Sequence, residues 1–223
     1  ASGGGMARSV RMRLALLRAK ACNKLLLPLN RDSLLMLDGY FTDHGTPNER
    51  MLAKYIIGCS YLDDNDAPRA VECFQKAISC ADTLDNKNCD YNTLSRIYAQ
   101  LGQLQLDQML PEDALKSNQY LIKYSLIAED TFSAISTYSM YDVIYHQLGM
   151  YDSVMSVCDR SVSMLKKYNN PQLTASALGV KMFMMVERND IKKAKPYIDY
   201  YEKHSGFYDS KTKSVKEGHE IYY

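Results

Sequence analysis

Tryptophan is absent from this chain of 223 residues, and no apolar run approaches the roughly 18 residues of a membrane-spanning helix. The six cysteines include no C-x-x-C pair, which structural zinc sites commonly use. A dominant charge is missing too, because the formal net charge is +1. A nearly neutral chain has no global field to attract nucleic acid. The composition, 46% hydrophobic and 24% charged, is that of an ordinary globular protein.

Acidic residues are missing before Asp32, whereas seven arginines and lysines precede it. An arginine-rich, acid-free beginning is one feature of a transit peptide. Helical spacing favours the other interpretation, an amphipathic helix with solvated cations and a buried apolar face. That face would consist of Val10, Leu14, Leu17, Ala21 and Leu25.

Strand signals are scarce, because no sustained period-2 alternation occurs between turns. Helical periodicity is nearly continuous instead, and the stretch YIIGCSYLDDNDAPRAVECFQKAI predicts two helices. The first is expected from about Asn48 to Leu62 and the second from Asp66 to about Asp82. Asp66 suits an N-cap, and Pro68 suits a first helical turn, where its missing N–H costs nothing. The short break predicts an antiparallel helix pair.

Landmarks of this pair recur along the chain. Ala70 follows Gly58 by 12 residues, and Ala114 follows Gly102 by the same 12. Residues in the place of Ala70 then recur at steps of 44, 40 and 40, at Ala114, Val154 and Ala194. The sequence therefore predicts four helix pairs, and the basic N-terminal helix with RDSLLMLDGYFTDHG makes a fifth.

This pattern resembles the tetratricopeptide repeat (TPR), which sets Leu-Gly, Tyr, Ala, Phe and Ala at fixed offsets. One repeat carries most of the match, at Ile57, Gly58, Tyr61, Ala70, Phe74 and Ala77. The second pair keeps Gly102 and Ala114 but has Asn118 and Leu121 where Phe and Ala belong, and the fourth keeps only Ala194. The resemblance implies an all-α fold, a right-handed solenoid of about five antiparallel helix pairs.

Small side chains explain the spacing physically, because two helices approach closely only where side chains are small. Gly58 and Ala70 are expected at the crossing of the pair. Tyr61 and Phe74 would fill the space beside it, and Ala77 would let the next helix pack.

A second resemblance covers residues 31–78. It is to exported repeat proteins common in Bacteroidetes, which show a DSL…YY…HG…ER…A.YYLG run before their first clear repeat. The matching residues here are Asp32, Ser33, Leu34, Tyr40, Phe41, His44, Gly45, Glu49, Arg50, Ala53, Tyr55, Gly58 and Tyr61. The resemblance implies the sensing or docking region of a longer protein. In such proteins a transmembrane helix, a coiled coil and a helix-turn-helix often follow.

The domain expectation is a linker or added remnant over 1–5 and a single TPR-like domain over 6–223. A membrane tether would lie outside this chain. The location would be periplasmic or membrane-associated if the resemblance holds, and cytoplasmic otherwise.

Motifs for catalysis are missing. No histidine sits in H-E-x-x-H, and neither a nucleophile elbow nor a phosphate-binding glycine loop occurs. The DDND segment lacks the glycine and glutamate of a calcium loop. We therefore expect no catalytic residues, no metal, no cofactor and no enzyme activity.

The first helix of each pair lines the concave face in solenoids of this type. Aligning the pairs on Gly58, Gly102, Asp142 and Met182 predicts a peptide groove. Its residues would be Tyr55, Cys59, Leu62, Arg96, Gln103, Leu106, Ser139, Val143, His146, Phe183 and Val186. The set lacks the basic, amide-rich clamp that some family members use for a C-terminal carboxylate. The alternative is a spacer whose groove binds nothing.

Several functions stay open at this point. A non-catalytic protein- or peptide-binding scaffold is favoured, and a sensing region of an attached regulator is its narrower form. A free-standing adaptor would also fit. An enzyme on an α-solenoid is disfavoured, because the spacing offers no cluster of reactive side chains. Direct binding of nucleic acid is not expected, since the basic N-terminal helix lacks interleaved aromatic residues.

Overall fold

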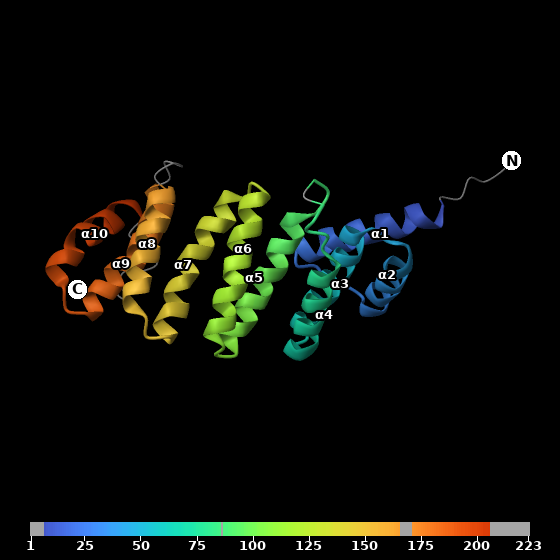
Figure 1. Cartoon of the computed structure of the whole chain (residues 1–223), viewed down its shortest axis with the longest axis horizontal. Coiled ribbons are helices and arrows are strands. Elements are labelled where there is room, and N and C mark those ends of the chain that lie inside the picture. The colour runs from blue at the N-terminus through green and yellow to red at the C-terminus, as the bar shows by residue number, and fades with distance from the viewer. Residues whose placement is uncertain (1–6, 86, 166–170, 206–223) are drawn as a thin grey trace. The chain divides into compact units, whose positions relative to one another are not determined.

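The computed structural model describes residues 7–85, 87–165 and 171–205. These residues form ten α-helices and no strand (Figure 1). The helices are α1 (Arg8–Lys24), α2 (Arg31–His44), α3 (Pro47–Asp63), α4 (Ala67–Cys80), α5 (Tyr91–Asp107), α6 (Pro111–Ile127), α7 (Thr131–Gln147), α8 (Tyr151–Leu165), α9 (Pro171–Glu187) and α10 (Ile191–His204). The predicted all-α class and the five helix pairs are confirmed. The predicted linker at 1–5 lies outside the described residues.

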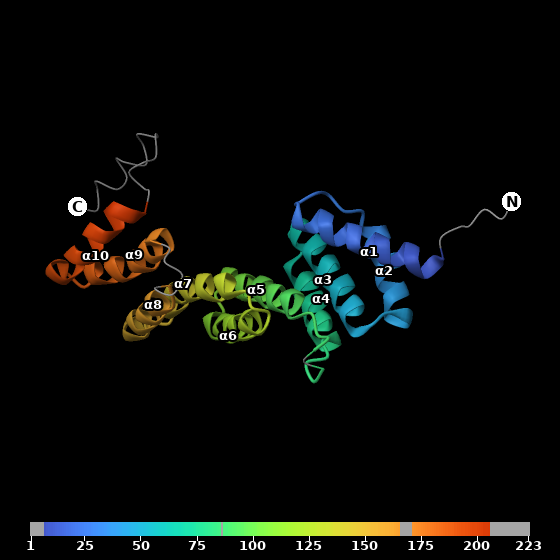
Figure 2. The ribbon, with the colours of Figure 1, turned by 90° about the horizontal axis from the view of Figure 1, so that it is seen from above.

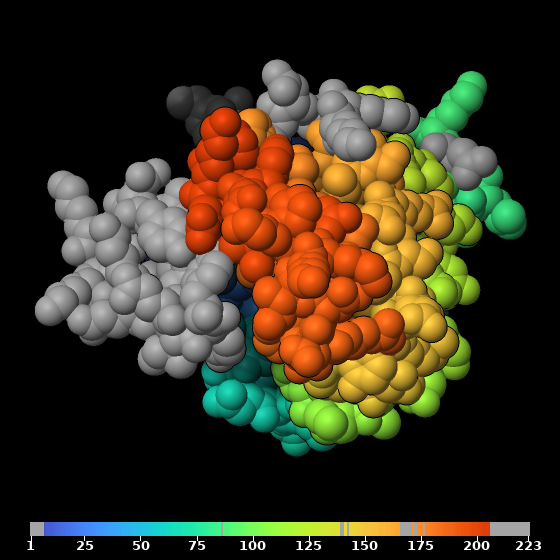
Figure 3. Space-filling model, turned by 90° about the vertical axis from the view of Figure 1, so that its left-hand side faces the viewer, coloured from blue at the N-terminus to red at the C-terminus, as the bar shows by residue number. Residues whose placement is uncertain are grey.

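Contacts group the helices into two compact units, within Ala1–Asp130 and Thr131–Tyr223. In the first unit α3 packs on α4 and α5 on α6, while α1 and α2 pack on α3 (Figure 2). In the second unit α7 packs on α8 and α9 on α10, and α8 contacts α9. Figure 3 shows α10 on the near surface of this unit. The sequence predicted one domain over 6–223, and that remains a prediction.

The turns inside the four later pairs repeat one backbone conformation. Asn65, Met109, Gly149 and Asn189 have φ values of 59°, 58°, 66° and 58°, in the left-handed region. These residues follow one another at steps of 44, 40 and 40, which is the period read from the sequence.

Each of these turns closes with the same hydrogen bond at the helix end. The N–H after the left-handed residue donates to a carbonyl five residues back, at 2.8 Å in all four pairs. The donors are Asp66, Leu110, Met150 and Asp190. This pattern is the Schellman motif, which satisfies carbonyls that the last helical turn leaves free.

The residue in the place of Ala70 is fully buried in every one of these pairs. Ala70, Ala114, Val154 and Ala194 each have 0% exposure. Three of the four are alanine, and the fourth is the larger valine. The repeat spacing predicted from the sequence therefore matches both the turns and the packing.

Gly58 lies where α3 crosses α4. A Cβ atom added there would lie 2.4 Å from Cε1 of Phe74, which is closer than real Cβ atoms approach any neighbour. Phe74 and Ala77 are both fully buried. Tyr61 is half-buried beside them, with the guanidinium of Arg31 4.2 Å from its ring centre.

Two other pairs use close contacts of different chemistry. A Cβ at Gly102 would lie 3.0 Å from Oδ1 of Asn118, which stands where the first pair has Phe74. A Cβ at Gly179 would lie 3.0 Å from Cε2 of Tyr201. The sequence alignment had placed Met182 at this crossing, so the close approach through Gly179 was missed.

The N-terminal helix was assigned the wrong buried face. The structure buries Leu16 and Ala19 of α1, whereas the expected core residues Val10, Leu14, Leu17 and Leu25 are 44–67% exposed. Met12 and Ala15 pack beside the buried pair. Both sets of residues have helical spacing, so periodicity could not choose between the two faces.

Helix starts agree closely with the sequence. Asp66 caps α4 by accepting a hydrogen bond from the N–H of Arg69 at 3.2 Å. Thr46 and Glu49 form a capping box at the start of α3. Pro196 lies inside α10, which begins at Ile191 and ends at His204.

We expect Gly58→Ala to lower the free energy of unfolding by about 1–3 kcal/mol, because the new methyl group must displace Phe74. Gly39→Ala is the matched control within α2. Its added Cβ meets nothing within 4 Å, so alanine should raise stability by about 0.5–1 kcal/mol. Denaturant unfolding measures both. Equal effects of the two variants would show that the crossing is not tightly packed.

Met109→Gly should stabilise the chain by about 0.5–1 kcal/mol, because an L side chain is strained at a φ of 58°. Gln108→Gly is the control one residue earlier, at a φ of −91°, where glycine should destabilise. Thermal unfolding measures both changes. A loss of stability in Met109→Gly would contradict the turn described here.

Candidate peptide-binding surface

Helix α1 covers two residues of the groove predicted along α3, Tyr55 and Cys59. Tyr55 and Cys59 are 7% and 8% exposed. Asn23 of α1 lies close enough to the Tyr55 hydroxyl and the Cys59 thiol to influence the pKa of both groups. These two side chains therefore present little surface to a partner while α1 is in place. The sequence offered no sign of this cover, because it did not show where the N-terminal helix packs.

Burial also decides the protonation of these two groups. It raises the pKa of Cys59 to about 11 and holds the pKa of Tyr55 well above its ordinary value of 10. Both side chains are therefore neutral at pH 7. A thiol in this state is a poor nucleophile.

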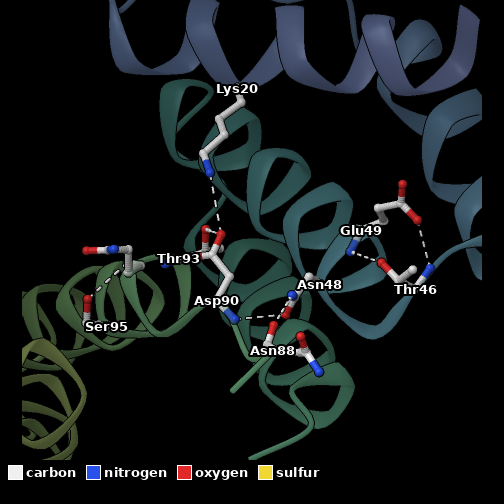
Figure 4. A network of polar contacts seen from close by, with 9 residues as sticks. Lys20, Thr46, Asn48, Glu49, Asn88, Asp90, Thr93 and Ser95 are labelled. Carbon is white, nitrogen blue, oxygen red and sulfur yellow. Dashed lines mark hydrogen bonds and ion pairs between the residues drawn. The ribbon is translucent and has the colours of Figure 1, made fainter. Parts of the chain in front are cut away.

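Asp90 joins three helices at one end of this surface (Figure 4). As the N-cap of α5, its carboxylate accepts hydrogen bonds from the N–H and the hydroxyl of Thr93, at 3.0 and 2.7 Å. Its backbone N–H donates to Oδ1 of Asn48 in α3 at 2.9 Å. The ammonium of Lys20 in α1 lies 3.4 Å from the carboxylate. One residue thus ties α1, α3 and α5 together.

The hydrogen bonds at this junction favour the charged carboxylate. Burial raises the pKa of Asp90, but the two bonds from Thr93 and the nearby Lys20 outweigh burial and hold the pKa below 3.8. A second ion pair holds α1 on α3, with Nε of Arg13 2.7 Å from Oε1 of Glu49. The position of α1 over Tyr55 is therefore fixed at two points.

Helix α5 leaves more of its predicted groove residues exposed. Arg96 and Gln103 are exposed and lie two turns apart on one face. Asn92, which the sequence analysis did not single out, is exposed one turn before Arg96. Leu106 is only 7% exposed, and Leu62 at the end of α3 is half-buried. The open part of this surface in the first unit is therefore a row of polar side chains along α5, in which Nε2 of Gln103 donates to Oδ1 of Asp107 at 2.8 Å.

Groove residues of the second unit are mostly exposed. Val143 and Phe183 are 48% and 46% exposed, and Val186 is half-buried. His146 is exposed, with its Nε2 3.8 Å from Oε2 of Glu187. This contact becomes an ion pair only if the imidazole is protonated. The side chain of Ser139 lies outside the described residues.

Two residues beside His146 were missed by sequence reasoning. Tyr151 meets the His146 ring edge-on, with ring centres 5.8 Å apart. The guanidinium of Arg188 lies 5.4 Å from the centre of the Tyr151 ring. With Glu187 they line a shallow depression between α8 and α9. Because these residues come from different pairs, helical spacing alone gave no sign of the cluster.

A second missed feature is a set of stacked tyrosines on α5 and α6. The rings of Tyr98 and Tyr120 lie 4.9 Å apart, and those of Tyr98 and Tyr124 lie 5.7 Å apart. Tyr120 is 45% exposed. Burial raises the pKa of Tyr98 to about 12, so its hydroxyl stays a donor at neutral pH. The spacing of Tyr120 and Tyr124, four apart on one helix, was the available signal.

No cluster of three or more metal-binding side chains occurs in the part of the chain that the structure describes. Within the same residues, no helix is both long and apolar enough to cross a membrane. None of the six cysteines, all within the described residues, forms a disulfide, and Cys59 and Cys158 are buried.

Solved structures share this fold over most of the chain. A protein described as a kinesin light chain with nearly identical TPR-like repeats, from Podosopora anserina, matches with a TM-score of 0.68 and 9% identity, covering 93% of this chain and all of its own. Aspartyl phosphate phosphatase F from Bacillus subtilis matches at 0.62 and 15%, covering 89% of this chain and 61% of its own. BtubC from P. vanneervenii matches at 0.60 and 11%, with 89% and 91% covered. The chain therefore has a TPR-like helical-repeat fold.

Sequence comparison gives partial matches to curated proteins. No family model matches the chain. It is 27% identical over 147 residues to the 43 kDa receptor-associated protein of the synapse from Gallus gallus, which covers 64% of this chain. The same protein from Tetronarce californica is 27% identical over 143 residues, or 63% of this chain. The chain spans 34% of the length of each of these relatives. The resemblance to Bacteroidetes proteins has no counterpart among these matches.

Asp90→Ala should lower the free energy of unfolding by about 0.5–2 kcal/mol, because α5 loses its N-cap. Asp90→Asn is the control, since asparagine also caps a helix but cannot form an ion pair with Lys20.

The same residue predicts a pH dependence of stability. Because the pKa of Asp90 lies below 3.8 in the folded chain, its negative charge stabilises the fold above that pH. The advantage of wild type over Asp90→Asn should fade as the pH falls through the folded pKa. Unfolding curves at pH 7 and pH 3 measure this, and an advantage that grew at low pH would contradict the junction.

Proposed function

We propose that the chain is a non-catalytic scaffold that binds a protein or an extended peptide along the exposed face of its repeats. The observation that carries the proposal is the row of Asn92, Arg96 and Gln103 on α5. Amide and guanidinium donors spaced along one helix suit the regularly spaced carbonyls of an extended peptide. The backbone beneath these side chains is already ordered as a helix pair, so on this side of the interface binding has only side chains to order.

Two further points support a binding role. A TPR-like fold suggests a protein-interaction scaffold, and the curated relatives are receptor-associated by name. The neutral thiol and hydroxyl of Cys59 and Tyr55 offer no activated group for catalysis. An enzyme on this solenoid is the disfavoured alternative.

The groove should be tested with a displayed library of random peptides, selected against the full chain. The variant is Arg96→Ala with Gln103→Ala, and the matched control is Lys116→Ala with Gln119→Ala, which changes exposed residues on α6 instead. We expect selected peptides to bind the first variant at least about tenfold more weakly, because side-chain donors are lost. The control should bind like wild type.

Two results would contradict the proposal. Selection that enriches no common peptide motif would indicate a spacer with an inert groove. Peptides that lose affinity equally in both variants would bind a surface other than α5. Far-UV circular dichroism of all variants shows whether the helices remain folded.

The narrower form of the proposal places this chain in the sensing or docking region of a larger membrane-associated regulator. It rests on the DSL…HG…ER residues shared with exported Bacteroidetes repeat proteins, and on a span of only 34% of the curated relatives. A free-standing adaptor in the cytoplasm or periplasm is the alternative. Fractionation of source cells with an antibody to this chain separates the two. A membrane band well above 25.4 kDa favours the regulator, and a freely extracted band near that mass favours the adaptor.

A further inference from the structure

The outward face of α1 carries a regular apolar seam. Val10, Leu14, Leu17 and Ala21 follow one another at steps of four, three and four residues. This is the spacing of the a and d positions of a coiled coil, where another helix packs. Val10, Leu14 and Leu17 are 44%, 49% and 58% exposed, and Ala21 is exposed as well. No described residue covers this seam.

The exposure of the seam follows from the way α1 packs on the first unit. The opposite side of α1 buries Leu16 and Ala19 at 3% and 5% exposure, against the core of the first unit. The ion pairs of Arg13 and Lys20 fix its rotation. Helix α1 therefore has two apolar faces, and the unit uses only one.

Cations occupy all four positions that flank the seam. With Leu14 at a and Leu17 at d, Arg11 and Arg18 fall at e positions, and Arg13 and Lys20 at g positions. Arg13 and Lys20 are already paired with Glu49 and Asp90. Arg11 and Arg18 form no ion pair within the described residues. The e side of the seam thus keeps two uncompensated positive charges.

These charges select among the possible occupants. A second copy of α1 would place cations against cations, which is destabilising in a coiled coil. A lipid surface favours a wide apolar face with aromatic residues at its edges. The seam is instead narrow, has the small Ala21 at its centre line, and has no aromatic residue between 8 and 24.

We propose that the outward face of α1 is a docking site for an amphipathic helix of another protein, with an apolar seam at its a and d positions and acidic residues beside it. The small Ala21 lets the partner helix approach closely. Acidic residues of the partner face Arg11 and Arg18. This surface lies on a different helix from the α5 groove, so the two can be tested separately.

The probe is a fluorescent helical peptide of about three heptads, with leucine at a and d and glutamate at e and g. A matched peptide carries lysine at e and g. We expect the full chain to bind the glutamate peptide at least about tenfold more tightly than the lysine peptide, at low salt. Fluorescence anisotropy measures both affinities.

Variants assign the binding to α1. Leu14→Gln with Leu17→Gln should weaken the glutamate peptide at least about tenfold, because the seam loses its apolar surface. Arg11→Glu with Arg18→Glu should reverse the preference toward the lysine peptide. The matched controls are Leu84→Gln, which changes a leucine that is 95% exposed outside α1, and Lys192→Glu in α10. Both controls should bind like wild type.

Three outcomes would overturn the proposal. The first is binding of neither peptide, and the second is equal binding of both, which would show that the cations do not select a partner. Binding of anionic phosphatidylglycerol vesicles that depends on Leu14 and Leu17, without binding of the glutamate peptide, would make α1 a membrane-surface helix instead. Circular dichroism of each variant separates loss of docking from loss of folding.

Discussion

The close crossing of α3 and α4 at Gly58 constrains the rest of the first unit. The backbone at Gly58 lies so near the ring of Phe74 that even one methyl group has no room. That approach fixes the rotation of both helices, and with it the faces they turn outward. Ala70 and Ala77 are fully buried because the same closeness extends along the pair. The buried contacts on one side of each helix therefore determine which side chains the other side exposes to a binding partner.

Two other helix pairs also cross closely, but with different residues at the contact. Asn118 takes the place of Phe74 in α6 and is 1% exposed, and neither atom of its amide has a hydrogen-bond partner among the described residues. The α9–α10 pair uses Gly179 against Tyr201. The position of Phe74 is thus buried in α6 as well, although the residue there is different. Close packing of two helices requires a small residue somewhere along their contact, but not at one fixed position.

The first unit also shows how an added helix changes a repeat surface. Helix α1 packs on α3, buries Tyr55 and Cys59, and is fastened by Asp90 and Glu49. The surface on which a peptide could bind is thereby displaced toward α5. Helix α1 also exposes the apolar seam of Val10, Leu14, Leu17 and Ala21 on its outward face. The two proposed interaction surfaces are therefore linked through one helix, although their residues lie on different elements.

Local spacing determined the helix pairs, their period and the buried place shared by Ala70, Ala114, Val154 and Ala194, because helical periodicity and turn residues are local properties of a chain. The Asp66 cap was readable for the same reason. Only the tertiary structure decided which face of α1 is buried, since Leu14 and Leu16 both belong to apolar faces with helical spacing. It also decided the cover over Tyr55 and the junction at Asp90, because these depend on contacts between residues 32–70 positions apart. A sequence pattern defines the faces of a helix, but packing against other helices chooses among them.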